Sequence, residues 1–274
     1  MQQSASRSCC ETDKMQLSVT SIPDTTPIGK ILRLPLRLVG PNTVVRVLRG
    51  PLRGKRWIAG SNVHGCWLGM YECTKLSRFA ALLSAGDVVF DLGANVGLYT
   101  LLAATKVGHT GQVIAFEPLK RNLQYLRTHL QLNNVHNVRV VEKAVSDRTE
   151  SAFFRESQSA SMGCLSVEGT VSVQTITLDD FLRSGAPAPQ CIKIDVEGAE
   201  ASVLAGGRET IAKHRPIVFV AIHARSLHRR CVEELRTHGY ECQEIETSGA
   251  DGSIPRDETW RAEILAVHSS RLSP

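Results

Sequence analysis

The sequence has little of what marks several common protein classes. Aromatic residues make up only 5% of the 274 positions, too few for a surface on which nucleic-acid bases stack. None of the eight cysteines forms a Cys-x-x-Cys pair, so we expect no zinc ribbon. No apolar run reaches the ~18 residues of a membrane span, and residues 1–14 lack the apolar core of a secretory signal. These absences predict a cytoplasmic protein in a reducing compartment.

What is present is typical of a globular domain. Hydrophobic residues make up 42% of the chain and charged residues 22%, and the length suffices for one domain with an extension. The net charge of +5 arises from mixed charges, and we interpret the basic stretches 46–56 and 225–230 as solvated surface. Phosphate or nucleic-acid binding by these stretches is the alternative. We expect no nucleic-acid partner.

Three segments follow from changes in composition and pattern. Residues 1–28 are rich in Ser, Thr, Gln and Pro and are expected to form a disordered tail. Residues 29–75 contain two short strand patterns with Gly and Pro turns, which predict a β-hairpin and loop extension. Strand and helix patterns alternate over residues 76–270 and predict an α/β domain.

The predicted fold class is α/β, with a Rossmann-like, seven-stranded methyltransferase sheet that carries helices on both faces. Five strand–helix units come first and an antiparallel pair closes the sheet, which fits a methyltransferase better than a six-stranded dinucleotide fold. A further hairpin is predicted as an insertion at residues 151–177. The seven predicted strands lie at 88–90, 112–116, 138–141, 191–194, 217–222, 240–245 and 262–267.

One stretch, Asp87–Thr100, organises the rest of the chain. Residues 88–90 form a short apolar run, as in a strand covered on both faces. Gly93 and Gly97 then bracket a turn where backbone can approach a ligand, and a helical pattern follows. Such a unit places its turn at the carboxyl end of a parallel strand, where open α/β sheets bind ligands.

The spacing of the glycines in this turn indicates which kind of ligand the turn could bind. A dinucleotide turn needs Gly-x-Gly-x-x-Gly to seat a pyrophosphate at a helix N-terminus. Here the middle position is Asn95, and Gly97 comes one residue too early. No Gly-Lys-Thr/Ser follows, so a Walker A loop is excluded. A turn without a phosphate cradle suits a ligand without phosphates, and S-adenosylmethionine is such a ligand.

Acidic residues at two strand ends are candidates to contact this cofactor. Asp91 could face its ammonium or sulfonium group, and Glu117, 26 residues later, could accept both ribose hydroxyls. The loop after the third strand could border the adenine. The predicted cofactor-binding residues are Asp91, Gly93, Ala94, Asn95, Gly97, Glu117, Pro118, Val145, Ser146 and Asp195.

The second informative stretch is Ile192–Glu200. Lys193, Asp195 and Glu197 alternate with apolar residues, so we expect them to share one face at a strand end, on the ligand side. There Asp195 and Glu197 could orient a hydroxyl, hold a metal or take a proton. An internal salt bridge that only stabilises the turn is the alternative. Glu200 is interpreted as a first-turn acid favoured by the helix dipole.

A histidine ends the fifth strand on the same side of the sheet. His223 could act as the base that removes the proton of a methyl acceptor. The predicted catalytic residues are therefore His223, Asp195 and Glu197, without a resident metal. His64 and Tyr71, in the loop before the domain, are expected to line the same pocket.

Four motifs point to one protein family. They are Phe90–Gly97, Phe116–Pro118, Thr177–Asp180 and Lys193–Glu200, of which the last is the most diagnostic. Together they resemble the FkbM family of S-adenosylmethionine-dependent methyltransferases over about half of the chain. The resemblance implies O-methylation, often of sugar or natural-product hydroxyls. The chain departs from the family at the fifth strand, where Ala221 stands at a position that often carries glutamate.

The combined prediction is methyl transfer from S-adenosyl-L-methionine to a hydroxyl of a sugar, glycan or secondary metabolite. Three alternatives stay open at this point. One adds a divalent metal at Asp195 and Glu197, which would bind two acceptor oxygens. The second is a nicotinamide-dependent oxidoreductase, and the third is a non-catalytic nucleotide-binding module. N-methylation of RNA is less expected, because no Asn/Asp-Pro-Pro-Tyr motif follows the fourth strand.

Overall fold

The computed structural model describes residues 36, 38–156, 163–165, 169–245 and 261–272. The predicted tail over residues 1–28 lies outside the described residues, as does most of the Ser- and Gly-rich centre of the insertion. Among the helices in the described ranges, none combines the length and the hydropathy needed to cross a bilayer.

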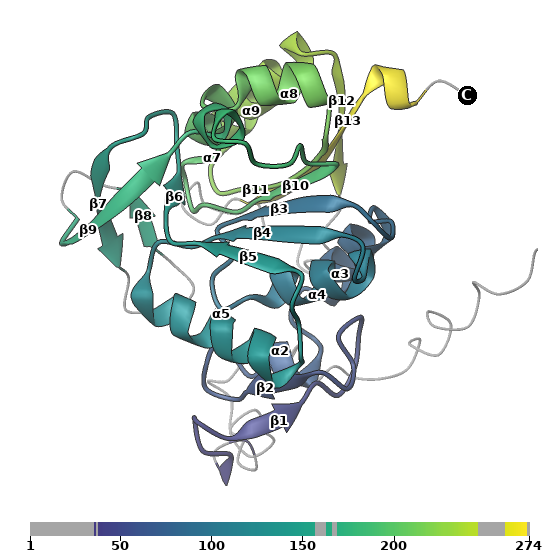
Figure 1. Ribbon diagram of the computed structural model, residues 1–274, viewed down its shortest axis with the longest axis vertical. Coiled ribbons are helices and arrows are strands. Elements are labelled where there is room, and N and C mark those ends of the chain that lie inside the picture. Colours follow the sequence, from purple (N-terminus) through teal and green to yellow (C-terminus); the bar gives the residue numbers. More distant parts are fainter. Residues whose placement is uncertain (1–35, 37, 157–162, 166–168, 246–260, 273–274) are drawn as a thin grey trace, which may run out of the picture.

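A seven-stranded sheet forms the centre of the molecule (Figure 1). Its strands are β3 Val88–Leu92, β4 Gln112–Phe116, β5 Val138–Val141, β10 Cys191–Ile194, β11 Ile217–Ile222, β12 Tyr240–Ile245 and β13 Ala262–His268. Their order in the sheet is β12-β13-β11-β10-β3-β4-β5, and β13 is antiparallel to both of its neighbours. The seven predicted strands and the closing antiparallel pair are confirmed.

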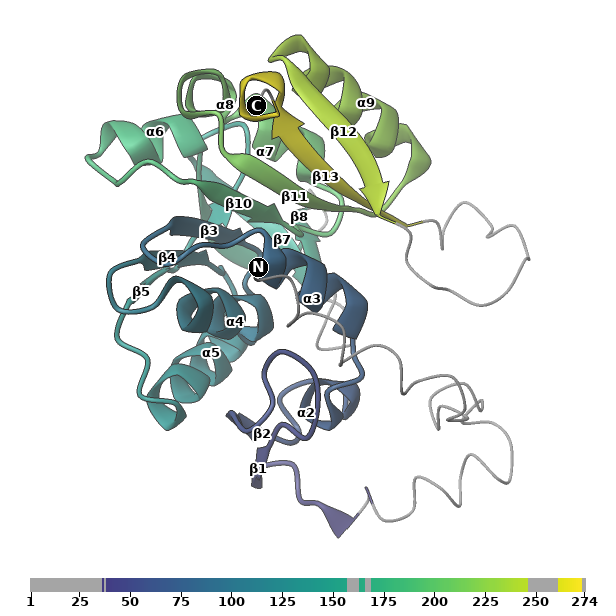
Figure 2. The same ribbon diagram turned by 90° about the vertical axis from the view of Figure 1, so that its right-hand side faces the viewer.

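Helices cover both faces of this sheet (Figures 1 and 2). The helices are α3 Cys73–Ala81, α4 Leu98–Val107, α5 Lys120–Leu132, α6 Leu178–Arg183, α7 Glu200–Ala205, α8 Arg208–His214 and α9 Arg225–Thr237. Val89 and Val113 belong to a core with α3 and α4, whereas the next residues, Phe90 and Ile114, belong to a core with α6 to α9. Because both faces are covered, the central strands β3, β4, β10 and β11 are rich in apolar residues. The helix α8 was not predicted.

The insertion after β5 forms a small sheet of its own. Its strands are β6 Ala144–Val145, β7 Ser151–Glu156, β8 Gly163–Leu165 and β9 Val171–Ile176, in the order β6-β9-β7-β8. The predicted inserted hairpin is therefore confirmed within the described residues. The parallel pairing of β6 with β9 is an addition that the sequence pattern did not indicate.

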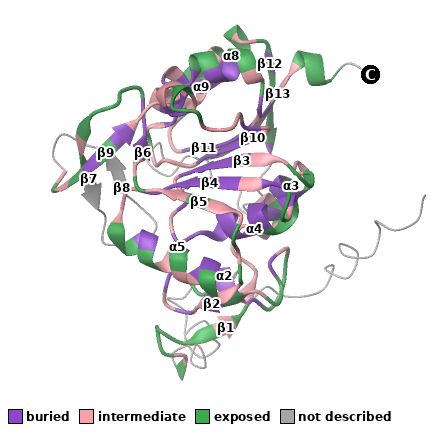
Figure 3. Cartoon of the chain, viewed as in Figure 1, coloured by how far each residue is buried: buried purple, intermediate pink, exposed green. Residues whose placement is uncertain are grey.

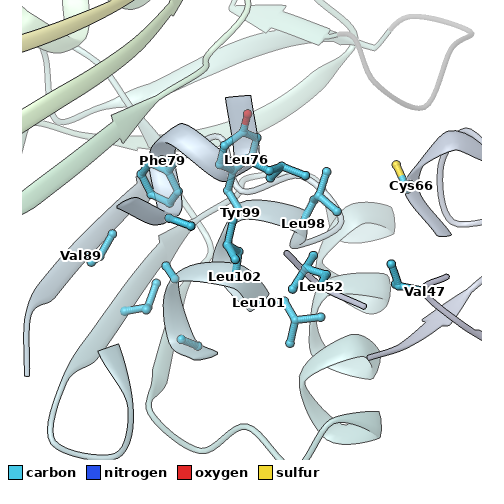
Figure 4. Packing of buried hydrophobic residues seen from close by; sticks show 14 of the residues in the cluster. Val47, Leu52, Cys66, Leu76, Phe79, Val89, Leu98, Tyr99, Leu101 and Leu102 are labelled. Atoms are coloured by element: carbon cyan, nitrogen blue, oxygen red, sulfur yellow. The ribbon is translucent and has the colours of Figure 1, made fainter. Parts of the chain in front are cut away.

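The N-terminal extension is a hairpin that shares its core with the main sheet. Its elements are β1 Val44–Arg46, β2 Arg56–Ile58 and the short helix α2 Gly65–Leu68. Val47, Leu52 and Cys66 lie in one cluster with Phe79 of α3 and Leu101 of α4 (Figure 4). The hairpin is confirmed, while the segment between β2 and α3, which was expected to be a loop, contains a helical turn.

A buried histidine of α5 fastens the hairpin to the domain. The His129 imidazole stacks on the indole of Trp57 with ring centroids 3.7 Å apart, and neither side chain is exposed. Its Nε2 accepts from the N–H of Ile58 at 3.1 Å, and its Nδ1 donates to the carbonyl of Val96 at 2.8 Å. This pattern requires the neutral ring. Burial lowers the pKa of His129 to about 4.

This neutral histidine predicts a loss of stability in mild acid. The ordinary pKa of the ring is 6.5, so the unfolded chain takes up a proton first as the pH falls. His129 should lower the free energy of unfolding by about 2 kcal/mol between pH 7 and pH 5. Urea unfolding at both pH values measures this loss, and His129→Gln should reduce it. His136→Gln, at an exposed position, is the control. The same pH dependence in the wild type and His129→Gln would contradict the assignment.

The glycine turn between β3 and α4 packs closely on two other parts of the chain. Gly93 has φ +78°, and a Cβ built on it would overlap the carbonyl oxygen of Asp195. Gly97 has φ +94°, and a Cβ there would meet the side chain of Leu126 on α5. Both glycines are therefore needed for packing within the protein, a role that the sequence analysis did not foresee.

The close approach at Gly93 predicts a large effect for a single methyl group. Gly93→Ala should lower the free energy of unfolding by about 1–3 kcal/mol more than Gly185→Ala, because it adds a clash to backbone strain. Gly185 is the matched control, since it has φ +92° and a Cβ added to it would meet no atom within 4 Å. Urea unfolding compares the two variants. Equal losses would mean that the Gly93 turn can move away from β10 at no cost.

Candidate active site

A buried lysine joins the carboxyl ends of two neighbouring strands. Lys193 on β10 is almost fully buried, and its Nζ lies 3.3 Å from Asp91 Oδ1 and 3.3 Å from Asp195 Oδ2. It also donates to the carbonyl of Gly93 and lies 4.7 Å from the ring centroid of Tyr99. Burial alone would lower the pKa of Lys193, but the two carboxylates outweigh it and raise the pKa, so the side chain is charged.

Both oxygens of Asp91 lie next to groups of the protein. Oδ2 accepts from the hydroxyl of Thr100 at 2.6 Å, while Oδ1 faces Lys193 without a hydrogen bond of good geometry among the described residues. The side chain has no exposed surface. Asp91 thus lies, as predicted, where the parallel strands end at their carboxyl ends, which we call the edge or polar edge. Its contact with a cofactor stays a prediction.

His223 follows β11 and is held among three carboxylates. Its Nδ1 lies 2.7 Å from Oε1 of Glu200, whose side chain has no exposed surface. That oxygen also accepts from the N–H of Gly198, so it is an acceptor and the imidazole Nδ1 donates to it. Nε2 therefore carries the lone pair of the neutral ring. It lies 3.6 Å from Asp195 Oδ1 and 3.4 Å from Glu197 Oε2.

The pKa values of the two acids beside His223 shift in opposite directions. Burial would lower the pKa of His223, but the hydrogen bond to Glu200 and the charges of Asp195 and Glu197 outweigh it and raise the pKa. Burial would raise the pKa of Asp195, yet Lys193 and His223 hold it below its usual range. For Glu197 burial prevails and the pKa is raised. Asp195 is thus the more firmly ionised of the pair.

The role of Glu200 was missed in the sequence. It begins α7, as a first-turn acid should, but its side chain turns inward to the imidazole of His223. The two residues lie 23 positions apart in sequence, and no local pattern relates them. The predicted set of Asp195, Glu197 and His223 is nevertheless brought together as expected.

Glu117 ends β4 beside the glycine turn and is largely occupied by the chain itself. Its carboxylate accepts from the backbone N–H groups of Asn95 and Leu119 and from the side-chain amide of Asn122. A carboxylate has about four acceptor positions, so roughly one is left for a ligand hydroxyl, where the sequence analysis foresaw two. Burial raises the pKa of Glu117 despite these three hydrogen bonds.

The residues predicted to border the adenine are engaged within the fold. Val145 and Ser146 are buried, and the N–H of Ser146 donates to the carbonyl of Ile176. The carbonyl of Ser146 packs on Gly206, where a Cβ would overlap it. Pro118 is half-buried next to Glu117. Contact of these residues with a nucleotide stays a prediction.

Every backbone N–H group of the glycine turn already has an acceptor. From residue 93 to 97, two donate to the carbonyl of Phe116, one to the carboxylate of Glu117, and two to acceptors within the turn. A phosphate cradle requires free N–H groups that converge on the ligand. The turn is therefore not arranged to hold a pyrophosphate, which agrees with its glycine spacing.

A second polar cluster, absent from the sequence predictions, extends the edge toward β13. Lys75 on α3 contacts Glu263 of β13 and lies 3.2 Å from Glu72, which accepts from the hydroxyl of Tyr99 at 3.0 Å. Glu263 is 4% exposed, and its Oε2 has no hydrogen-bond partner among the described residues. Burial raises the pKa of Glu263 to about 7 against the opposing charge of Lys75.

A glutamate of β13 lies opposite Ala221, the residue of β11 that departs from the family pattern. Ala221 of β11 pairs directly with Glu263 of β13. Residues opposite each other in an antiparallel pair project from the same face, so the neighbouring strand supplies a carboxylate beside the small Ala221 side chain. Glu263 was not among the residues predicted for the site.

The two loop residues predicted to line the pocket differ in their surroundings. Burial raises the pKa of Tyr71, with the charges of Glu72 and Asp195 adding to it, so its hydroxyl lies within electrostatic reach of the edge. His64 is exposed, and its Nδ1 accepts from the indole N–H of the buried Trp67 at 3.1 Å. The ring of His64 is therefore held against Trp67.

The arrangement at the edge serves two kinds of chemistry. Asp195, Glu197 and His223 each offer one ligand atom, and these atoms lie within 4.8 Å of one another. Such a set suits a divalent metal, and metal-binding histidines often donate their other ring N–H to a carboxylate, as His223 does to Glu200. The same geometry suits a histidine that accepts a proton.

Three comparisons place the chain among known proteins. A sequence model of the methyltransferase FkbM domain matches residues 91–242, which are 152 of its 274 residues. Hexuronic acid methyltransferase AglP of Haloferax volcanii is 32% identical over 141 residues, which cover 50% of this chain and 56% of AglP. The 2-O-methyltransferase NoeI of Sinorhizobium fredii is 28% identical over 160 residues, which cover 50% of this chain and 65% of NoeI. The matches thus span between half and two thirds of these relatives.

The solved structure of a methyltransferase FkbM from Methylobacillus flagellatus has a similar fold. It superposes with a TM-score of 0.50 at 18% sequence identity, covering 74% of this chain and 53% of the other. The matched segment 91–242 contains the buried lysine, its two aspartates and the histidine of the edge. Since the sequence model matches more than half of this chain, the chain belongs to the methyltransferase FkbM domain family.

Proposed function

We propose that this protein transfers the methyl group of S-adenosyl-L-methionine to a hydroxyl of a sugar, a glycan or a secondary metabolite. The observation that carries the proposal is the edge itself, where Asp195 lies between an oriented histidine, His223, and a glycine turn with no free N–H groups. Family membership and the names of the two relatives, a hexuronic acid methyltransferase and a 2-O-methyltransferase, support it.

The charges of the edge fit a cationic, phosphate-free cofactor. Six carboxylates share this region with three Lys and Arg side chains: the acids are Glu72, Asp91, Asp195, Glu197, Glu200 and Glu263, and the cations are Lys75, Lys193 and Arg261. Negative charge in excess attracts an ammonium or sulfonium group. Asp91 and Asp195 are the candidates to face these groups, and Glu117 has a free acceptor position for a ribose hydroxyl. When bound, the cofactor supplies an electrophilic methyl group.

The chain's own residues would orient the acceptor and take its proton. Nε2 of His223 is the basic atom, because Glu200 fixes the N–H on Nδ1. The acceptor hydroxyl would lose its proton to Nε2 as its oxygen takes the methyl group, with the bond from that carbon to the sulfonium sulfur breaking and S-adenosylhomocysteine as the second product. Asp195 and Glu197, at 3.6 and 3.4 Å from Nε2, would stabilise the imidazolium that results. Alignment of the reacting atoms supplies much of the rate.

The main rival function is nicotinamide-dependent oxidation. It would need a pyrophosphate at the glycine turn, where the N–H groups of residues 93–97 are already used. Opening these hydrogen bonds would cost free energy that a phosphate-free ligand does not require. A binding module without catalysis is disfavoured by the oriented His223 and the ionised Asp195 beside it.

Binding experiments test the cofactor. Isothermal titration calorimetry should detect binding of S-adenosylmethionine and S-adenosylhomocysteine, and a thermal-shift assay should detect no stabilisation by NAD⁺. Glu117→Ala should weaken binding at least about tenfold, because a charged hydrogen bond to the ribose is lost. Glu142→Ala, at an exposed position after β5, is the matched control and should leave the affinity unchanged. If the intact protein bound neither S-adenosylmethionine nor S-adenosylhomocysteine, the proposal would be wrong.

A separate variant tests the base. Transfer of a radiolabelled methyl group to a panel of hexuronic acids and oligosaccharides should fall roughly 100-fold or more in His223→Ala. Affinity for S-adenosylhomocysteine should change less than about twofold, because the imidazole acts on the acceptor. His228→Gln on α9 is the control.

Two results would overturn the role of His223. Unchanged turnover in His223→Ala would show that another group takes the proton. Loss of wild-type activity with a chelator, restored by added Mg²⁺ or Mn²⁺, would instead make Asp195, Glu197 and His223 metal ligands.

A further inference from the structure

The longest stretch of the sequence without an acidic residue covers most of the N-terminal extension. Between Asp24 and Glu72 the sequence contains eight Lys and Arg residues and no acidic residue. We call residues 38–63, the described part that carries β1 and β2, the basic hairpin. Five of the eight cations lie within it: Arg46, Arg49, Arg53, Lys55 and Arg56.

The basic hairpin also exposes aliphatic side chains. Within the described ranges, six large apolar side chains are exposed, and four of them belong to the basic hairpin. These four are Leu38 at 87%, Leu48 at 53%, Val44 at 49% and Val63 at 47% exposed. A single exposed leucine needs no explanation, but a concentration in one short segment marks an interaction surface.

Cations and apolar groups share the outer face of the hairpin. Val45 pairs with the buried Trp57 on the inner face, so Val44 and Arg46 project outward, and Figure 3 shows this strand largely exposed. Arg46 pairs directly with Arg56 across the two strands. Like charges in directly opposite positions destabilise a sheet. The pairing of Arg46 with Arg56 therefore does not stabilise the hairpin.

Arg46 and Arg56 lack the acidic partners, among the described residues, that several other surface arginines have. Arg127, Arg183 and Arg208 each form a salt bridge with a glutamate. No salt bridge joins Arg46 or Arg56 to an acidic side chain of the described residues, and the guanidinium of Arg46 donates to the carbonyl of Gly54. These two charges are available to an anionic partner.

We propose that the basic hairpin docks on an anionic lipid bilayer. Arginine and lysine side chains meet the acidic headgroups, and the exposed leucine and valine side chains enter the boundary between headgroups and acyl chains. A nucleic acid would be better served by exposed aromatic rings, but Trp57 and Trp67 of this region are buried. The mixture of cations with aliphatic groups favours the lipid surface.

Docking at this place would bring the membrane close to one side of the candidate active site. The carbonyl of Trp67 accepts from the N–H of Leu48, and Gly69 packs on the backbone of Arg49. Three residues further along, Glu72 accepts from the hydroxyl of Tyr99 at the polar edge. The hairpin and the wall of the site are therefore one packed unit.

Vesicle flotation of the full chain tests the proposal. The protein should bind vesicles that contain phosphatidylglycerol, bind phosphatidylcholine vesicles weakly, and detach at about 1 M salt, where charges are screened within ~3 Å. Arg46→Gln/Arg56→Gln should reduce partitioning roughly 25-fold, at about fivefold for each arginine. Leu48→Ser should reduce it with the charge unchanged. Arg229→Gln/Arg230→Gln, two exposed arginines of α9, is the matched control and should bind like the wild type.

Each other outcome counts against the proposal. Thermal denaturation first establishes that the variants are folded. Equal binding by Arg46→Gln/Arg56→Gln and the wild type, or an equal loss in the α9 control, would overturn the assignment of the basic hairpin. Binding to single-stranded RNA without binding to anionic vesicles would assign this face to a nucleic acid. Because no methyl acceptor or cofactor enters the assay, the result is independent of the proposed reaction.

Discussion

The candidate site depends on one interaction, the burial of Lys193 between Asp91 and Asp195. Removing a lysine and two carboxylates from water costs several kcal/mol for each ion, and their attraction offsets this only when the geometry is good. Lys193 achieves it with two carboxylates at 3.3 Å and the carbonyl of Gly93. The same ammonium thus fixes the end of β3, the end of β10 and the glycine turn. Such an arrangement contributes little net stability and instead holds charges in fixed positions.

Fixed charges at this edge have consequences for what it can bind. The Lys193 charge keeps Asp195 ionised, and Asp195 in turn favours the protonated form of His223 at 3.6 Å. Glu200 completes the arrangement by fixing the ring tautomer. The region remains short of positive charge even so, since the second cluster adds two glutamates for one lysine. A site with this imbalance is prepared for a cationic ligand before the ligand arrives.

Local patterns predicted the fold well and the site only in part. The central strands were found because they are rich in apolar residues and lie between turn signals, and the residues that meet at Nε2 of His223 follow strand ends that could be recognised. Glu200 and Glu263 were not found, because their partners lie 23 and 188 positions away. The glycines were assigned to the ligand alone, since the sequence does not reveal that the backbone of Asp195 packs against Gly93. What escaped prediction is contact between distant segments.

The boundary of the family match divides the residues at the edge into two sets. Residues 91–242 contain the glycine turn, Lys193, Asp195 and His223, which are the groups proposed to act on the cofactor and the proton. Glu72, Lys75 and Glu263 lie outside this segment but face the same edge. The two sets are nevertheless one packed structure. The basic hairpin packs on the loop that ends at Glu72, and Glu72 accepts from the hydroxyl of Tyr99, whose ring centroid lies 4.7 Å from the Nζ of Lys193.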